Sequence, residues 1–403
     1  MRRGPLKLTA AVAAVVIAAT LPASAQALPV PVATAGAAAA AITPAATSTT
    51  VADPAESVMD SLADYWSAVF PAQFGQSFVR LSSGTAGLDS GVGGNGSMCV
   101  TEASQIMGNA YYCPQADGIV YDTGVLVPVL EHDYGPGAVA ASLAHEYGHA
   151  IAARVGPTVT DRAQDPKKYP ALFVELQADC YSGTFLKAAT EQRAGGTTLD
   201  PDRLATAVSP LLDFRDAVGV DPAGNTAHGL GTDRLQALVH GWLGSPAECH
   251  DMTLKSLRIT LGTRGVRTDG SLPRFADDTA LRQATRKSLT AFLATETGAA
   301  AVRADDVRFT AEQRATATPI GQFALASAGV HAAMTRAFGP GPSAACWTGA
   351  WVGAVFPTRG GDRLGSWAGD PDEALDMFRT TEPDTATLLA YTAGFAEGSA
   401  ACR

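Results

Sequence analysis

Apolar residues recur at helical spacing in two neighbouring stretches of the chain. The first begins after Gly135-Pro136-Gly137 and ends at Gly156-Pro157, and glycine and proline in these places are typical of helix ends. The second follows Pro170, which suits a first helical turn, and places Leu172 and Leu176 on one face. The pattern therefore predicts two amphipathic helices joined by a short connection.

A different pattern opens the chain. Basic side chains within residues 1–7 precede an uncharged run over residues 8–21, and Ala23-Ser24-Ala25 follows that run. A transmembrane helix needs about 20 apolar residues, so the shorter run is typical of a secretory signal peptide. We predict a signal peptide over residues 1–25, with an uncleaved membrane anchor as the alternative. Residues 26–53, rich in Ala, Pro, Val and Thr, are predicted to form a linker.

The composition places the rest of the chain among folded proteins. Hydrophobic residues make up 46% of the 403 residues and charged residues 17%, which excludes wholesale disorder. The net charge of -10 offers no basic surface, so we expect neither a nucleic-acid partner nor stable membrane insertion after signal cleavage. The length allows more than one domain, and we predict domains over residues 54–250 and 251–403.

Candidate chemistry lies on the first predicted helix, where His145-Glu146-Tyr147-Gly148-His149 matches the pattern H-E-x-x-H. Residues four apart lie about 40° apart around a helix, so the two imidazoles present their rings to one point. His145 and His149 are therefore predicted to be zinc ligands. The alternative is a chance match, and a third ligand elsewhere in the chain decides between the two.

The second predicted helix supplies that ligand. A metzincin would have glycine and histidine where this chain has Ala152 and Val155, which excludes that class. Glu175 and Asp179 lie on the apolar face of the second helix, where an unpaired carboxylate is strongly unfavourable. We predict that Glu175 binds zinc and that Asp179 holds a ligand imidazole through its second N–H. A solvated acidic face is the alternative.

These residues resemble the bacterial neutral zinc metallopeptidases of the gluzincin-like type. Residues 145–149 and 175–183 match the family patterns H-E-x-G-H and E-L-Q-A-D-C-[YF]-x-G, and the second match is the more specific. Residues 112–122 and 228–234 add weaker matches, so the resemblance spans about residues 57–249. Ala150 departs from the family, which often has histidine there.

The resemblance implies an α+β, mostly helical, zincin-like catalytic domain with a small sheet beside the two metal-bearing helices. Residues 119–122 would form a strand, and an edge strand of such a sheet can hold an extended peptide. The family block also makes His228 the candidate for stabilising the oxyanion, with Tyr147 and Tyr134 behind it. A surface or structural role for His228 is the alternative.

Glu146 is predicted to be the general base. It lies about 100° from His145 around the helix, so its carboxylate reaches toward a water at the metal rather than toward the ion itself. Zinc with three protein ligands keeps one position for that water and lowers its pKa to about 7.

The C-terminal part of the chain resembles a degenerate copy of the first half. Residues 178–185 read against residues 344–351, and the predicted ligands have no counterparts in the second segment. A helical domain that repeats the first would pair the six cysteines as Cys180–Cys249, Cys346–Cys402 and Cys99–Cys113. Disulfides suit an exported chain. Chance alignment of helices rich in Ala and Gly is the alternative.

The function that these observations favour is a secreted zinc-dependent peptidase, with Zn²⁺ as cofactor and a peptide or protein as substrate. The alternative is an exported binding or scaffold protein in which zinc is structural and nothing is hydrolysed. Glu146 separates the two, because a structural zinc site has no need of a carboxylate beside its first histidine.

Overall fold

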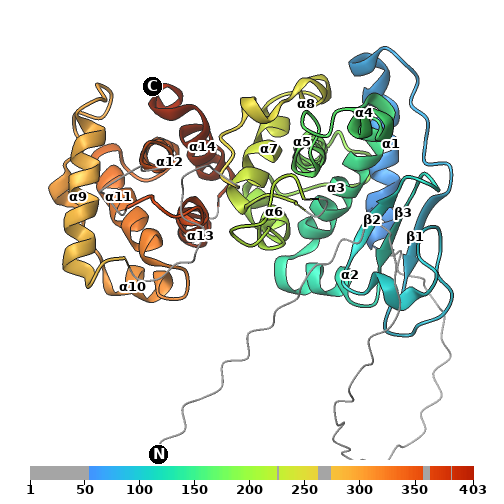
Figure 1. The fold of residues 1–403 in the computed structure, drawn as a ribbon, viewed down its shortest axis with the longest axis horizontal. Helices are drawn as coiled ribbons and strands as arrows, with labels where there is room; N and C mark the ends of the chain where they lie inside the picture. Colours follow the sequence, from blue (N-terminus) through green and yellow to red (C-terminus); the bar gives the residue numbers. More distant parts are fainter. Residues whose placement is uncertain (1–53, 225–226, 262–273, 357–363, 383) are drawn as a thin grey trace, which may run out of the picture.

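The computed structural model describes residues 54–403, apart from 225–226, 262–273, 357–363 and 383. The predicted signal peptide and linker lie outside the described residues. Among the residues described, no helix combines the length and the apolar character needed to cross a bilayer. The predicted fold class is confirmed, because the chain is mostly helical with one small sheet (Figure 1).

The sheet lies at one end of the molecule and consists of β1 (Gly84–Leu88), β2 (Ala110–Cys113) and β3 (Gly118–Asp122) in the order β1-β3-β2 (Figure 1). β1 runs parallel to β3, and β2 runs antiparallel to it. The predicted strand at residues 119–122 is therefore confirmed as the central strand, buried along its whole length. β2 is an edge strand, and both β2 and β3 contact the first of the two predicted helices.

Helices make up the rest of the N-terminal half, which we define as residues 54–251. The two predicted helices are confirmed as α3 (Pro136–Val155) and α5 (Ala171–Thr190). Pro136 occupies the first turn of α3, and Gly156 ends it with a φ of 95°, in the left-handed region that favours glycine. The others are α1 (Pro54–Phe74), α2 (Leu126–Val129), α4 (Val159–Gln164), α6 (Leu204–Asp213), α7 (Gly231–Leu243) and α8 (Pro246–Asp251).

Small residues let these helices approach closely. A Cβ on Gly148 of α3 would lie 2.6 Å from the carbonyl oxygen of Ala178 on α5. A Cβ on Gly183 of α5 would likewise lie 2.0 Å from the carbonyl oxygen of Leu238 on α7. Real side chains do not tolerate such distances, so these glycines set the spacing of the three helices that carry the candidate site.

The C-terminal half, residues 274–403, repeats this close packing. A Cβ on Gly349 of α12 would lie 2.0 Å from the carbonyl oxygen of Tyr391 on α14, and Gly394 meets Cys346 at the same distance. This crossing matches that of α5 and α7, and it supports the predicted duplication. The helices of this half are α9 (Asp278–Leu293), α10 (Ala311–Ala317), α11 (Gln322–Phe338), α12 (Pro342–Val355), α13 (Asp370–Thr381) and α14 (Thr385–Glu397).

The predicted disulfides are confirmed. Cys180–Cys249 joins α5 to α8, Cys346–Cys402 ties α12 to the chain end, and Cys99–Cys113 closes a short loop beside β2. The first two bridges occupy equivalent places relative to the glycine crossings, as a duplication requires.

The main apolar core extends through both halves among the described residues. Helices α13 and α14 pack against α6 and α7, where the halves meet side by side (Figure 1). Within the C-terminal half, Arg274 forms a buried two-point ion pair with Asp370 at the start of α13. The division at residue 250 stays a prediction about domains, because the core runs across it.

We expect Gly394→Ala to destabilise the fold, because the added methyl group would overlap the backbone of α12. Overpacking of this kind costs about 1–3 kcal/mol or more in the free energy of unfolding, which urea titration would measure. Gly196→Ala is the matched control, since its Cβ meets only the Ser61 hydroxyl at 3.4 Å. Equal stability of the two variants would contradict the close helix crossing.

Glu373 of α13 provides a test of pH dependence. Burial and the nearby Asp370 raise its pKa from 4.5 to about 7, although backbone N–H groups of Phe323 and Ala324 favour the charged form. Because burial in the folded protein favours the neutral carboxyl group, the contribution of Glu373 to the free energy of unfolding is complete below about pH 4.5. This contribution is lost as the pH rises through about 7 and the carboxyl group ionises. We therefore expect Glu373→Gln to gain stability relative to the unsubstituted protein between pH 4.5 and 8, measured by urea unfolding. Parallel pH profiles would contradict this.

Candidate metal centre

The three predicted ligands converge between α3 and α5. Nε2 of His145 lies 3.2 Å from Nε2 of His149 and 3.3 Å from Oε2 of Glu175. Nε2 of His149 lies 3.6 Å from Oε1 of Glu175. A tetrahedral zinc ion with bonds of about 2.0–2.1 Å needs its ligand atoms about 3.3 Å apart. The residues therefore fit such an ion in both type and spacing.

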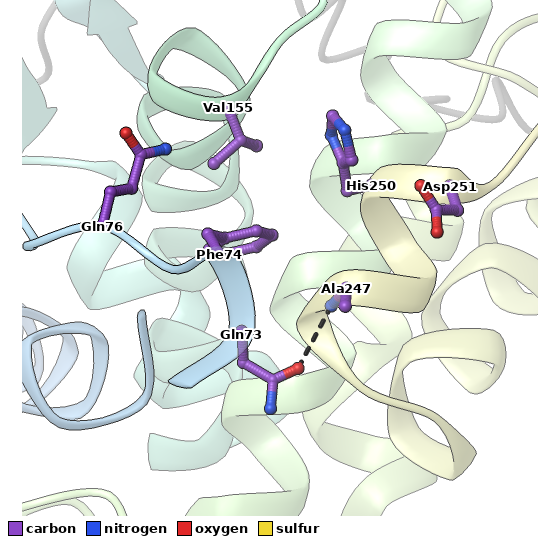
Figure 2. Close-up of a pocket in the computed structure, with 7 residues that line it drawn as sticks. All are labelled: Gln73, Phe74, Gln76, Val155, Ala247, His250 and Asp251. Atoms are coloured by element: carbon purple, nitrogen blue, oxygen red, sulfur yellow. Dashed lines mark hydrogen bonds between the residues drawn. The ribbon is translucent and has the colours of Figure 1, made fainter. Parts of the chain in front are cut away.

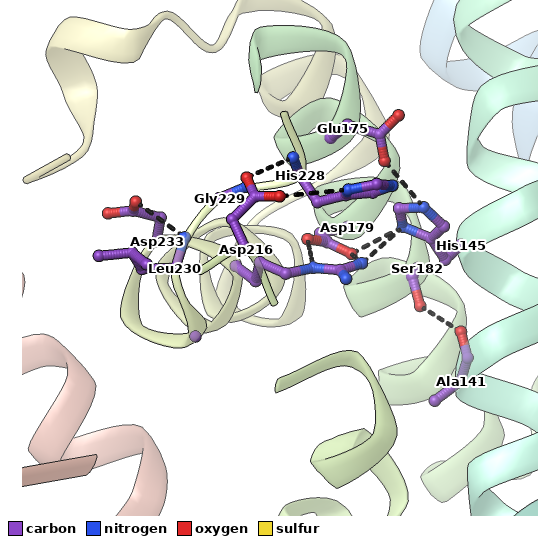
Figure 3. Close-up of polar contacts among 12 residues, drawn as sticks. Ala141, His145, Glu175, Asp179, Ser182, Asp216, His228, Gly229, Leu230 and Asp233 are labelled. Atoms are coloured by element: carbon purple, nitrogen blue, oxygen red, sulfur yellow. Dashed lines mark hydrogen bonds and ion pairs between the residues drawn. The ribbon is translucent and has the colours of Figure 1, made fainter. Parts of the chain in front are cut away.

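The orientation of the His145 ring supports the same conclusion. Its Nδ1 lies 2.7 Å from Oδ1 of the fully buried Asp179, so Nδ1 carries the proton and donates it to the carboxylate (Figure 3). In the neutral imidazole Nε2 then has a lone pair, which faces the Glu175 carboxylate and the second histidine. A zinc ion bound there would accept that lone pair together with those of the other two ligands.

Asp179 thus lies where its predicted role requires, and Arg234 fixes it in place. Nε of Arg234 donates to Oδ2 of Asp179 and Nη2 to Oδ1, both at 2.9 Å. Burial disfavours the charged carboxylate, but the arginine and His145 outweigh it and lower the pKa of Asp179. The sequence placed Arg234 in the family block without a role, and only the fold brings α7 behind α5.

Glu146 lies beside the three ligands without joining them. Its Oε1 is 4.0 Å from Nε2 of His145, and its Oε2 accepts a hydrogen bond of 3.0 Å from the backbone N–H of Tyr112 on β2. Burial raises the pKa of Glu146, although both histidines oppose the shift. The carboxylate is thus held at the edge of the ligand set by a neighbouring strand, where a general base is required.

His228 lies in the same cleft as the three ligands and is paired with Asp216. Its Nδ1 is 3.5 Å from Oδ1 of Asp216, while Oδ2 accepts the backbone N–H groups of His228 and Gly229 at 2.7 and 2.8 Å (Figure 3). Sequence reasoning missed Asp216, since no motif links it to the histidine. Of the other oxyanion candidates, Tyr147 is buried and Tyr134 bonds to Asp213. Neither lines the cleft described next.

One cleft of about 1160 Å³ is lined by the three candidate ligands together with Glu146, His228 and Arg234. β2 contributes Tyr111 and Tyr112 to its wall, and α6 and the segment after it contribute Leu211 and Phe214. A smaller depression of about 310 Å³ lies between the end of α1 and α8, where Gln73 accepts the Ala247 backbone N–H (Figure 2). None of the candidate site residues lines that depression.

Comparison with known proteins gives one family. A family model described as "Putative neutral zinc metallopeptidase" matches residues 30–250. Three mycobacterial relatives, the uncharacterized proteins Mb2605 of Mycobacterium bovis and MT2651 and Rv2575 of Mycobacterium tuberculosis, are each 28% identical over 182 residues. These alignments cover 44% of this chain and 54% of each relative, so the chain spans about half the length of the curated relatives it matches. No solved structure matches.

The contact between Arg234 and Asp179 predicts an effect on metal affinity. We expect Arg234→Lys to weaken zinc binding about 10- to 100-fold, because a lysine cannot hold both carboxylate oxygens and the His145 ring loses its fixed orientation. Competition with a chromogenic zinc chelator measures the affinity. Arg274→Lys is the matched control, because Arg274 forms the same kind of buried pair with Asp370 in the other half. Similar losses in both variants would contradict the assigned role.

Proposed function

We propose that this chain, which belongs to the neutral zinc metallopeptidase family, is a secreted peptidase that hydrolyses peptide bonds in a peptide or protein substrate. One observation carries the proposal: the Glu146 carboxylate lies within the cleft, 4.0 Å from a ligand nitrogen, and is not itself one of the ligands. A structural zinc site would surround the ion with four protein ligands and would not need this group.

His145, His149 and Glu175 would hold the zinc ion, which when bound would polarise the scissile carbonyl and lower the pKa of the attacking water. Glu146 accepts the proton of that water and then donates it to the leaving amine. Asp179 and Arg234 keep Nδ1 of His145 protonated and its ring oriented. Asp216 lies beside Nδ1 of His228, and in the imidazolium form, which carries a proton on both nitrogens, Nε2 of His228 would donate a hydrogen bond to the oxygen that becomes negatively charged in the transition state.

The cleft supports an extended peptide as substrate. β2 is an edge strand, its tyrosines line the cleft, and the backbone N–H of Tyr112 already faces Glu146. Sheet edges commonly capture an extended peptide as an added strand. A peptide bound beside β2 in this way would pass the general base. Secretion is supported by the three disulfides and by the predicted signal peptide.

We expect Glu146→Gln to retain zinc and to lose peptidase activity by a factor of about 10²–10⁴, because glutamine keeps the shape of the side chain but cannot accept the proton. Zinc content is measured by elemental analysis, and cleavage by mass spectrometry of a peptide library. Removal of zinc with a chelator should abolish cleavage by the unsubstituted protein, and added zinc should restore it.

Two results would overturn the proposal. Undiminished cleavage by Glu146→Gln would remove the general base from the mechanism. Stoichiometric zinc in a folded protein that cleaves no peptide of the library would favour the binding or scaffold protein with a structural ion.

A further inference from the structure

Helix α13 of the C-terminal half carries none of the candidate site residues. Its acidic side chains nevertheless contact the segment that carries His228 and Arg234. The carboxylate of Asp372 accepts the backbone N–H groups of Gly231 and Thr232 at 2.9 and 2.8 Å, and the Thr232 hydroxyl at 2.6 Å. These two residues begin α7. Gly229, whose N–H bonds to Asp216, lies two residues before this contact, and Arg234 lies two residues after it.

A second carboxylate on α13 holds another chain segment, the one that follows α6. Asp376 binds the Arg215 guanidinium at two points, with distances of 3.0 and 2.6 Å. Nε of Arg215 also lies 3.3 Å from Asp372, so the arginine bridges the two carboxylates. Arg215 directly precedes Asp216, which pairs with His228. One face of α13 therefore holds both chain segments that meet in the Asp216–His228 pair.

The same face of α13 also contacts α6. Arg379 of α13 forms an ion pair with Asp213, the last residue of α6, and its Nη1 donates to the Ser209 hydroxyl at 3.2 Å. α13 thus holds the segment over residues 213–216 through Asp213 and Arg215. Asp372 is only 5% exposed, so replacing it with asparagine, which keeps one acceptor oxygen, leaves part of this buried set without a partner and removes the charge that faces Arg215.

We propose that α13 acts as a positioning element for the active site: Asp372 and Asp376 fix residues 213–216 and 228–232 so that His228 faces the metal ligands. The C-terminal half thereby contributes to catalysis without contacting substrate. The catalytic part of this inference rests on the proposed function. The structural part, that the Asp216–His228 pair depends on α13, stands on the contacts alone.

The test compares three variants of the full-length mature protein: Asp372→Asn, Asp376→Asn and the control Asp370→Asn. Asp370 lies on the same helix and is buried, but its charged partner is Arg274. At temperatures well below unfolding, we expect the first two variants to lose about tenfold or more in kcat with zinc content unchanged, because small displacements of a catalytic group have effects of this size. The control should keep kcat within about twofold, whatever its loss of thermal stability.

Hydrogen exchange at the backbone amides of His228 and Gly229 gives a second readout that needs no activity. Both amides bond to Asp216, so their exchange should accelerate in Asp372→Asn and Asp376→Asn and stay unchanged in the control. In a His228→Ala background, Asp372→Asn should reduce kcat no further, because both substitutions remove the same interaction.

Each outcome bears on one of the two proposals. Equal loss of kcat in all three variants, or unchanged exchange at His228 and Gly229, would overturn the positioning role. The contact would then only stabilise the packing of the two halves against each other. A wild-type protein without peptidase activity would overturn the proposed function, while the exchange experiment would still decide whether α13 fixes the pair. If Asp372→Asn does not fold, the less buried Asp376→Asn carries the test.

Discussion

The arrangement of the candidate site depends on one electrostatic constraint. Two imidazole nitrogens and a carboxylate, all lone-pair donors, are held within 4.8 Å of one another in a largely buried position. They stay there because His145 is bound to Asp179 and Asp179 to Arg234. This series of contacts runs from α3 through α5 to α7, so the geometry of the site depends on how those three helices pack.

The packing depends in turn on glycine. Gly148 and Gly183 let α5 lie against both neighbours at backbone distance, which a methyl group would prevent. Short distances between helix axes bring Asp179 within reach of the short His145 side chain and of Arg234 at once. The same crossing occurs between α12 and α14, which carry none of the candidate ligands, so this close packing does not depend on a metal site.

The C-terminal half has an asymmetric relation to the N-terminal half. Its core continues that of the N-terminal half, and its polar face on α13 meets the segment that carries Arg215 and Asp216. Under the proposed positioning role, the C-terminal half contributes none of the candidate ligands and acts by fixing the segment that carries His228.

The sequence by itself determined the local features of this protein. Helix ends at Pro136 and Gly156, ligands four residues apart, and two carboxylates on an apolar face all follow from helical periodicity, which acts over a few residues. The spacing of repeated glycines and cysteines also predicted the disulfide pairing that the structure shows. Tertiary structure alone decided that Arg234 holds Asp179, that Asp216 faces His228, and that β2 rather than the central strand is at the edge. Those contacts join segments far apart in the chain, and no local periodicity records which distant side chain comes to lie behind another.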